Sequence, residues 1–165
     1  MISSQIQRQF TYHQWAWRHV FASLKQVDEA TYKEERPFFW GSMHGTVAHG
    51  LAADFVWLNR CQGHSPQKLP TAKEFANLEA ILEQLAIVWD DWEALLRSYS
   101  DEDYGRIIHY TTTEGFERQA RLVDIVQHMV NHGTEHRSQL TPVLYELGFP
   151  TPELDFIYFS LEHAV

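Results

Sequence analysis

Apolar residues recur every three or four positions in four stretches of the chain, the spacing that lines one face of a helix. The first stretch runs from residue 4 to about 27, and the second from 42 to about 61. The third runs from 71 to about 98, and the fourth from about 119 to 148. The pattern predicts four amphipathic helices, of which the third has the clearest apolar stripe.

Local signals mark the ends of these helices. The hydroxyl of Ser42 is placed to cap the second helix. Thr71 with Glu74 makes a capping box, from which we expect the third helix to start. Pro142 lies in the last turns of the fourth helix and has no N–H to donate, so we expect a kink there.

Two segments do not follow the helical period. In residues 106–118, β-branched and aromatic residues surround Glu114 and Gly115, a pair suited to a tight turn, so a small hairpin is expected. The tail from residue 151 to 165 is rich in aromatic residues, and we expect it to pack back on the helices.

Four helices joined by mostly short connections predict an all-α fold, a single domain spanning residues 1–165. The expected architecture is a four-helix bundle with a small hairpin-like excursion before the last long helix. A chain of this length buries enough surface to fold without disulfides. Ligand and metal sites of such bundles are built from side chains on facing helices, so functional residues are expected there.

Charge and composition exclude several classes of function. Asp and Glu outnumber Lys and Arg by 22 to 13, a formal net charge of −9, which argues against a nucleic-acid partner. The chain has no signal-like start and no apolar run of about 18 residues, which argues against a membrane partner. Its single cysteine, Cys61, cannot form an intrachain disulfide and fits a buried thiol. We therefore expect a soluble, cytoplasmic protein.

The segment "QHMVNHGTEHR", residues 127–137, carries the most distinctive chemistry, in a chain with 10 histidines. It places His128, His132 and His136 four residues apart on the fourth helix. Two imidazoles at this spacing can reach one ion at about 2.0–2.1 Å. All three span about 12 Å along the helix axis and cannot readily share one ion. The spacing alone leaves open whether the earlier or the later pair binds.

A further ligand would have to come from another helix. His44 and His49 on the second helix differ by five positions, so only one of them can face a given neighbour. We favour His49, because the small residues Ala52 and Ala53 on its side would let another helix approach, whereas His44 lies in the first turn, near the solvent end. Three neutral imidazoles would leave a coordination position for water or substrate.

Other interpretations of these residues are weaker. The letters "HGTEH" fit the pattern of inverted zinc peptidases, with Glu135 as general base, but only 29 residues follow His136, too few for the expected acidic ligand downstream. A single interior histidine is most simply a hydrogen-bonded core residue, and His13 fits a surface or satisfied polar residue. Asp54 or Asp124 could accept a hydrogen bond from a ligand imidazole.

Two blocks, "SMHGTVAHGLAADFVWL" and "LVDIVQHMVNHGTEHRSQLTPVLYELGFPTPELDF", resemble the DinB/YfiT-like family of metal-dependent enzymes. The second block is the specific one. Its "NHGTEHRSQ" is similar to the family's run of Asn-His, three residues, His-Arg and a Gln two positions on, followed by a Leu-Gly turn and an Asp in the tail. Ser138 stands where glycine is common in the family.

The resemblance implies a metal triad of His49, His132 and His136, with His128 as a neighbour one turn away. It also implies an up-down-down-up bundle, nickel or zinc as the ion, and a homodimer. Some relatives are similar to transferases or isomerases in which a metal lowers the pKa of a small thiol cosubstrate. We therefore expect a metal-dependent enzyme that activates a low-molecular-weight thiol or water for transfer to, or hydrolysis of, a small substrate. The alternative is a non-catalytic bundle, structural or sensing, stabilised by its metal.

Overall fold

The structure, a computed structural model, describes residues 1–164. This part of the chain is mostly helical and carries one small two-stranded sheet. None of its helices is both long and apolar enough to cross a membrane. The helices are α1 (Ile2–Leu24), α2 (Glu29–Lys33), α3 (Met43–Cys61), α4 (Leu78–Ser98), α5 (Leu122–Glu146) and α6 (Phe156–Glu162). The strands are β1 (Ile107–Thr111) and β2 (Glu117–Arg121), and short 3-10 turns cover Ala72–Glu74 and Asp103–Gly105.

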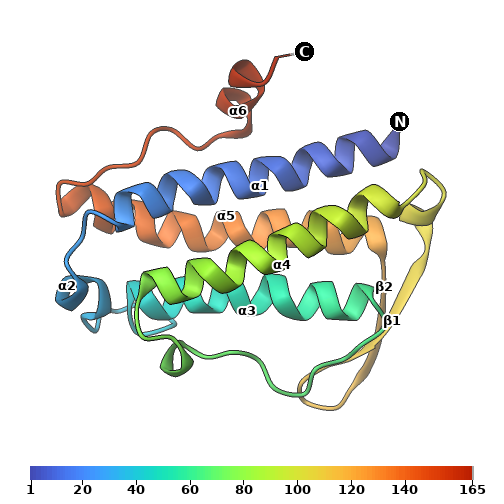
Figure 1. Cartoon of the computed structure of the whole chain (residues 1–165), viewed down its shortest axis with the longest axis horizontal. Coiled ribbons are helices and arrows are strands. Elements are labelled where there is room, and N and C mark those ends of the chain that lie inside the picture. Colours follow the sequence, from blue (N-terminus) through green and yellow to red (C-terminus); the bar gives the residue numbers. More distant parts are fainter. Residues whose placement is uncertain (165) are drawn as a thin grey trace.

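The four predicted helical stretches correspond to the long helices α1, α3, α4 and α5, which lie side by side (Figure 1). α1 packs against α4 and α5, and α3 packs against the same two helices. α1 and α5 run in one direction, and α3 and α4 run in the other. Their apolar faces meet in a core of buried side chains that includes Phe10, Met43, Trp92, Leu122 and Met129. The periodic residues therefore form the core that their spacing predicts.

The predicted hairpin is present. β1 and β2 pair in antiparallel fashion, in a register that places Ile107 opposite Arg121. Gly115 in the turn has a φ of 87°, a conformation that favours glycine. The hairpin lies where α3 ends and α5 begins (Figure 1), and the N–H of Leu122 donates to the carbonyl of Arg106 at 3.0 Å. The hairpin is thereby tied directly to the first residue of α5.

Ser42 caps α3 as predicted. Its hydroxyl accepts a hydrogen bond from the backbone N–H of Gly45 at 3.0 Å. This satisfies one of the free N–H groups in the first turn of the helix that carries His49. α5 runs through Pro142 and ends at Glu146, at the same end of the bundle as the start of α3 (Figure 1).

The predicted start of the third helix is wrong. Thr71 and Glu74 do form a capping box, but it closes only a 3-10 turn, because Phe75 beside it is extended, with φ −113° and ψ 124°. α4 begins after Asn77, whose side chain accepts from the N–H of Ala80 at 3.0 Å. A capping box satisfies the N–H groups of one turn, so by itself it does not distinguish a 3-10 turn from a long helix.

The C-terminal tail packs back on the helices, as expected. α6 lies beside α1 (Figure 1), and Phe159 is buried between them. The ring of Phe159 lies 5.7 Å, between centroids, from both Tyr12 and Trp15 of α1. The guanidinium of Arg8 covers the same ring at 5.2 Å.

The short helix α2 was not predicted. The side chain of Asp28 caps it, accepting from the N–H of Thr31 at 3.0 Å, and Tyr32 is buried against the core. Five residues are too few for a helical period to be visible in the sequence.

Candidate metal centre

The structure brings His49, His132 and His136 together across the contact between α3 and α5. The Nε2 atom of His132 lies 3.2 Å from Nε2 of His49 and 3.1 Å from Nε2 of His136. The candidate ligand atoms of all three residues lie within 4.8 Å of one another. The later pair on α5 and the favoured histidine of α3 therefore converge on one point.

These distances fit a shared cation. Ligand nitrogens about 2.05 Å from a tetrahedral ion lie about 3.3 Å from each other, close to the separations at His132. Hydrogen bonds alone explain the cluster less well, because one Nε2 atom offers either a hydrogen or a lone pair. His132 can complete only one linear hydrogen bond through that atom, although two imidazole nitrogens approach it.

The surroundings keep the three imidazoles neutral. His136 is buried, and His49 and His132 are half-buried. Burial, followed by the neighbouring imidazoles, lowers the pKa of His49 to about 4 and that of His132 to about 3. Burial also lowers the pKa of His136. Neutral imidazoles present the lone pairs that a metal ion needs, so the three residues are ready to bind near pH 7.

Two contacts orient the candidate ligands. Nδ1 of His136 lies 3.4 Å from Oε1 of Gln139, and an Nδ1–H donating there would leave Nε2 free for an ion. The indole of Trp40 stacks on the imidazole of His49, with centroids 3.8 Å apart and planes 17° from parallel. Gly45 permits this approach, because a Cβ at that position would lie 2.0 Å from the carbonyl oxygen of Trp40.

Trp40 was missed at the level of sequence. It lies in the segment "PFFWG" before α3, outside any helical period, and its side chain is partly exposed. The available signal was Gly45 in the first turn of α3. Glycine destabilises a helix, so its presence there indicates that another part of the chain approaches the backbone closely.

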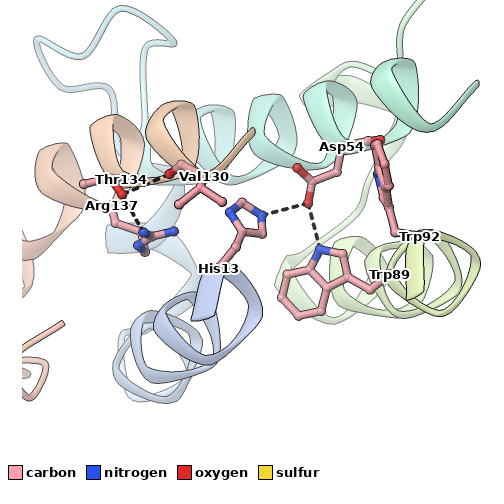
Figure 2. Close-up of polar contacts among 7 residues, drawn as sticks. All are labelled: His13, Asp54, Trp89, Trp92, Val130, Thr134 and Arg137. Carbon is pink, nitrogen blue, oxygen red and sulfur yellow. Dashed lines mark hydrogen bonds and ion pairs between the residues drawn. The ribbon is translucent and has the colours of Figure 1, made fainter. Parts of the chain in front are cut away.

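A buried polar network ties α1, α3 and α4 together beside this centre (Figure 2). Oδ2 of Asp54 lies 3.2 Å from Nε2 of His13 and accepts a hydrogen bond from Nε1 of Trp89 at 2.7 Å. Nε1 of Trp92 donates to the backbone carbonyl of Asp54 at 2.9 Å. All four side chains are buried. His13 is therefore not a surface residue.

Neither Asp54 nor Asp124 accepts the expected hydrogen bond from a ligand imidazole. Asp54 is held by His13 and Trp89, and Asp124 pairs with Arg121 at 2.8 and 2.9 Å. Asp54 acts on His132 only through its charge, which opposes the lowering of the His132 pKa.

Two residues of α5 that directly follow the candidate ligands hold that helix on α1. A Cβ on Gly133 would lie 2.5 Å from the ring of His13, so only glycine fits without a shift. Arg137 is buried and donates from Nη2 to Oγ1 of Thr134 at 2.8 Å (Figure 2). Its guanidinium lies 5.6 Å from the ring centroid of Trp17 in α1.

The remaining histidine and acidic candidates lie outside the cluster. His128 is exposed, and its ring centroid is 5.5 Å from that of His132. His44 is buried rather than near solvent, with Nε2 3.0 Å from the carbonyl oxygen of Ala72. The side chain of Glu135 is exposed. Among residues 1–164, the only cluster of three or more His, Cys, Asp or Glu side chains that could hold an ion is His49, His132 and His136.

The thiol of Cys61 is also outside the cluster. Burial raises its pKa to about 12, so it stays protonated near neutral pH. The expectation of a buried, unreactive thiol agrees with this environment.

Comparison with known proteins shows that the chain is similar to the DinB family. The model of the DinB family matches residues 1–162. Protein DinB of Bacillus subtilis (strain 168) is 20% identical over 157 residues, which cover 89% of this chain and 88% of that protein.

Two crystal structures share the fold. A DinB-like protein from Bacillus cereus ATCC 10987 has a TM-score of 0.54 and 18% identity, over 86% of this chain and 94% of that one. A mycothiol-dependent maleylpyruvate isomerase has a TM-score of 0.51 and 15% identity, over 82% of this chain. This chain matches only 60% of the length of that isomerase. With its family model matched over nearly the whole length, the chain belongs to the DinB family.

Proposed function

We propose that this protein binds a divalent metal ion, nickel or zinc, through His49, His132 and His136, and that it is a metal-dependent enzyme. One observation carries the proposal: three neutral imidazoles converge, and no carboxylate or thiol of the described residues joins them. A structural zinc site usually has four protein ligands, whereas a catalytic site keeps one position for water or substrate. Two of the three residues are half-buried, so the site is not closed off from solvent.

The expected reaction is transfer of a small thiol to an electrophile, or hydrolysis of a small substrate. When bound, the ion would act as a Lewis acid that lowers the pKa of the thiol or of water. The residues of the chain keep the imidazoles neutral and oriented: Gln139 holds the Nδ1 side of His136, and Trp40 covers one face of His49.

The thiol in this proposal comes from outside the protein. Cys61, the only cysteine, is buried, and its raised pKa prevents it from acting as a thiolate near neutral pH. The structural neighbour that depends on mycothiol supports a low-molecular-weight thiol as cosubstrate.

We also propose that α1, α3, α4 and α5 form the up-down-down-up four-helix bundle of the family, in one domain over residues 1–165. The directions of the four helices (Figure 1) and the family match over residues 1–162 support this arrangement.

A non-catalytic role is the second candidate. The three histidines come from two helices that pack against each other, so an ion there would also pin α3 to α5. In that case the ion would stabilise the fold but would bind no exogenous thiol.

Thiol binding separates the two candidates. Nickel- or cobalt-loaded protein would be titrated with bacillithiol, mycothiol, glutathione and coenzyme A, and also with cysteamine, while sulfur coordination is followed by absorption. We expect a new absorption band with at least one of these thiols, and metal-dependent turnover of an electrophilic acceptor with the same thiol. If no thiol changes the spectrum and chelation only lowers the melting temperature, the structural role is correct and the enzymatic one is wrong.

A further inference from the structure

Arg60, near the C-terminal end of α3, is a buried cation that no acidic residue of the described chain neutralises. The residue is 8% exposed, and its Nε atom is buried without a hydrogen-bond partner in residues 1–164. No carboxylate in that range lies within ion-pair distance, although the more distant charge of Glu114 acts on it. Burying an unpaired charge is costly, so an arginine in this state needs an explanation.

Two aromatic rings hold the guanidinium in place. Its central carbon lies 4.6 Å from the ring centroid of Trp57 and 4.6 Å from that of Tyr110 in β1. Trp57 and Tyr110 themselves meet edge to face, with centroids 5.1 Å apart. Stacking offsets part of the desolvation cost and fixes the plane of the guanidinium, yet leaves its N–H donors in need of acceptors.

The clamped arginine connects to the candidate metal centre through aromatic contacts. The ring of His128 lies 5.3 Å from that of Trp57 and 5.5 Å from that of His132. On α3, Arg60 follows His49 by eleven residues, about 16 Å along the axis. Helical side chains lean toward the N-terminus, and Arg60 accordingly lies over Trp57, on the side of His49.

We propose that Arg60, with His128 as a second donor, binds the anionic group of the small thiol whose sulfur reaches the three histidines. The ligand class is a low-molecular-weight thiol that carries a carboxylate or a phosphate. An extended tripeptide spans about 10 Å, and the arginine side chain, which leans toward the N-terminus of α3, shortens the axial separation of about 16 Å. A guanidinium binds either oxyanion through two parallel N–H donors. The proposal rests on the proposed function, because it assigns the far end of the same substrate.

The test compares thiols that differ in charge, on nickel- or cobalt-loaded full-length protein. Glutathione carries carboxylates, coenzyme A carries phosphates, and glutathione diethyl ester has the same thiol without carboxylates. We expect the wild type to bind glutathione or coenzyme A roughly tenfold or more tightly than the ester, followed by the absorption band of sulfur coordination. The thiol favoured by the wild type shows whether the group is a carboxylate or a phosphate.

Two variants make the comparison specific. Arg60→Gln should lose roughly tenfold in affinity for the favoured anionic thiol and leave binding of the ester unchanged. Arg118→Gln is the control, because Arg118 lies on the hairpin that carries Tyr110 but covers the exposed ring of Phe116, at 5.4 Å; this variant should bind as the wild type does. If the wild type binds neither glutathione nor coenzyme A more tightly than the ester, the proposal is overturned, and this comparison needs no variant to fold. Equal affinities of Arg60→Gln and wild type for the anionic thiol also overturn it.

A binding experiment on metal-free protein separates this inference from the proposed function. If no thiol, cysteamine included, coordinates the loaded protein, the proposed function fails, and the anion site is then tested with inorganic phosphate on metal-free protein. The expected result is a phosphate-dependent rise in melting temperature that Arg60→Gln loses and Arg118→Gln keeps. No rise in the wild type, or the same rise in Arg60→Gln, would show that Arg60 only clamps the hairpin to α3.

Discussion

His132 lies between two other imidazoles, and its charge state follows from that position. Burial and the nearby rings of His49 and His136 disfavour a proton on it, and they lower its pKa to about 3. A proton and a metal ion compete for the same lone pair, so an imidazole with a lowered pKa has its lone pair free for a metal near neutral pH. The three neutral imidazoles can therefore bind an ion near pH 7 without first releasing a proton.

The lowered pKa values predict how the metal-free protein responds to acid. Unfolded histidine titrates near pH 6.5, whereas His49 and His132 in the folded chain titrate near 4 and 3. Above pH 6.5 both states are neutral and no stability is lost. As the pH falls from about 6.5 toward 4, the unfolded state binds protons first, so the free energy of unfolding decreases.

Urea unfolding of metal-free protein at several pH values measures this effect. A His132→Gln variant should lose less stability than the wild type over the same pH range, since carboxylates titrate equally in both. Parallel pH profiles of the two proteins would show that the histidine does not contribute to the acid sensitivity.

Trp40 offers a second test at the scale of single residues. Its indole restricts the orientation of the His49 ring. Removing a residue that orients a metal ligand typically weakens metal binding, so Trp40→Ala should lower the metal affinity by roughly tenfold. Competition with a chromophoric chelator measures the affinity. Phe39→Ala is the control, because Phe39 is 86% exposed beside it; equal weakening in both variants would contradict a specific role for the stack.

Helix α5 carries two of the candidate ligands, and its position depends on residues between and beside them. Gly133 lies against the ring of His13 with no room for a methyl group. Its neighbour on the chain, His132, faces α3, where its Nε2 atom lies 3.2 Å from that of His49. The contact between α1 and α5 therefore sets the distance between the α5 ligands and His49.

Replacing Gly133 with alanine tests this packing. Alanine is the better helix former by about 0.5–1 kcal/mol, but the added Cβ would lie 2.5 Å from the His13 ring. Overpacking typically costs about 1–3 kcal/mol, so we expect net destabilisation and weaker metal binding. Urea unfolding and metal competition would measure both, with Gly50→Ala as control, where the nearest atom of Trp17 is 3.3 Å away. A Gly133→Ala protein as stable as the wild type would contradict the tight contact.

At the scale of elements, periodicity and turn chemistry predicted most of what the structure shows. The helical stretches and the hairpin around Gly115 were predicted because their signals are local. The start of α4 was wrong because the capping box at Thr71 and Glu74 closes its own short turn, and Asn77 is the true cap. The helix α2 was too short to have a period.

For the whole molecule, the candidate site was predictable only in part. Helical spacing selected two possible pairs on α5, and the need for a facing helix indicated His49; the family resemblance then selected the later pair. Contacts between distant segments left no local pattern. Neither the stack of Trp40 on His49, nor the pairing of His13 with Asp54, nor the aromatic clamp around Arg60 could be predicted from one sequence.

The central claim is that three histidines from two helices hold one ion. Elemental analysis of the purified protein tests it most directly, performed on the wild type, His49→Ala, His132→Ala and, as control, His128→Ala. We predict one divalent ion per chain in the wild type and in His128→Ala, and loss of most of it in the other two variants. No stoichiometric metal in the wild type, or the same metal content in all four proteins, would contradict the claim.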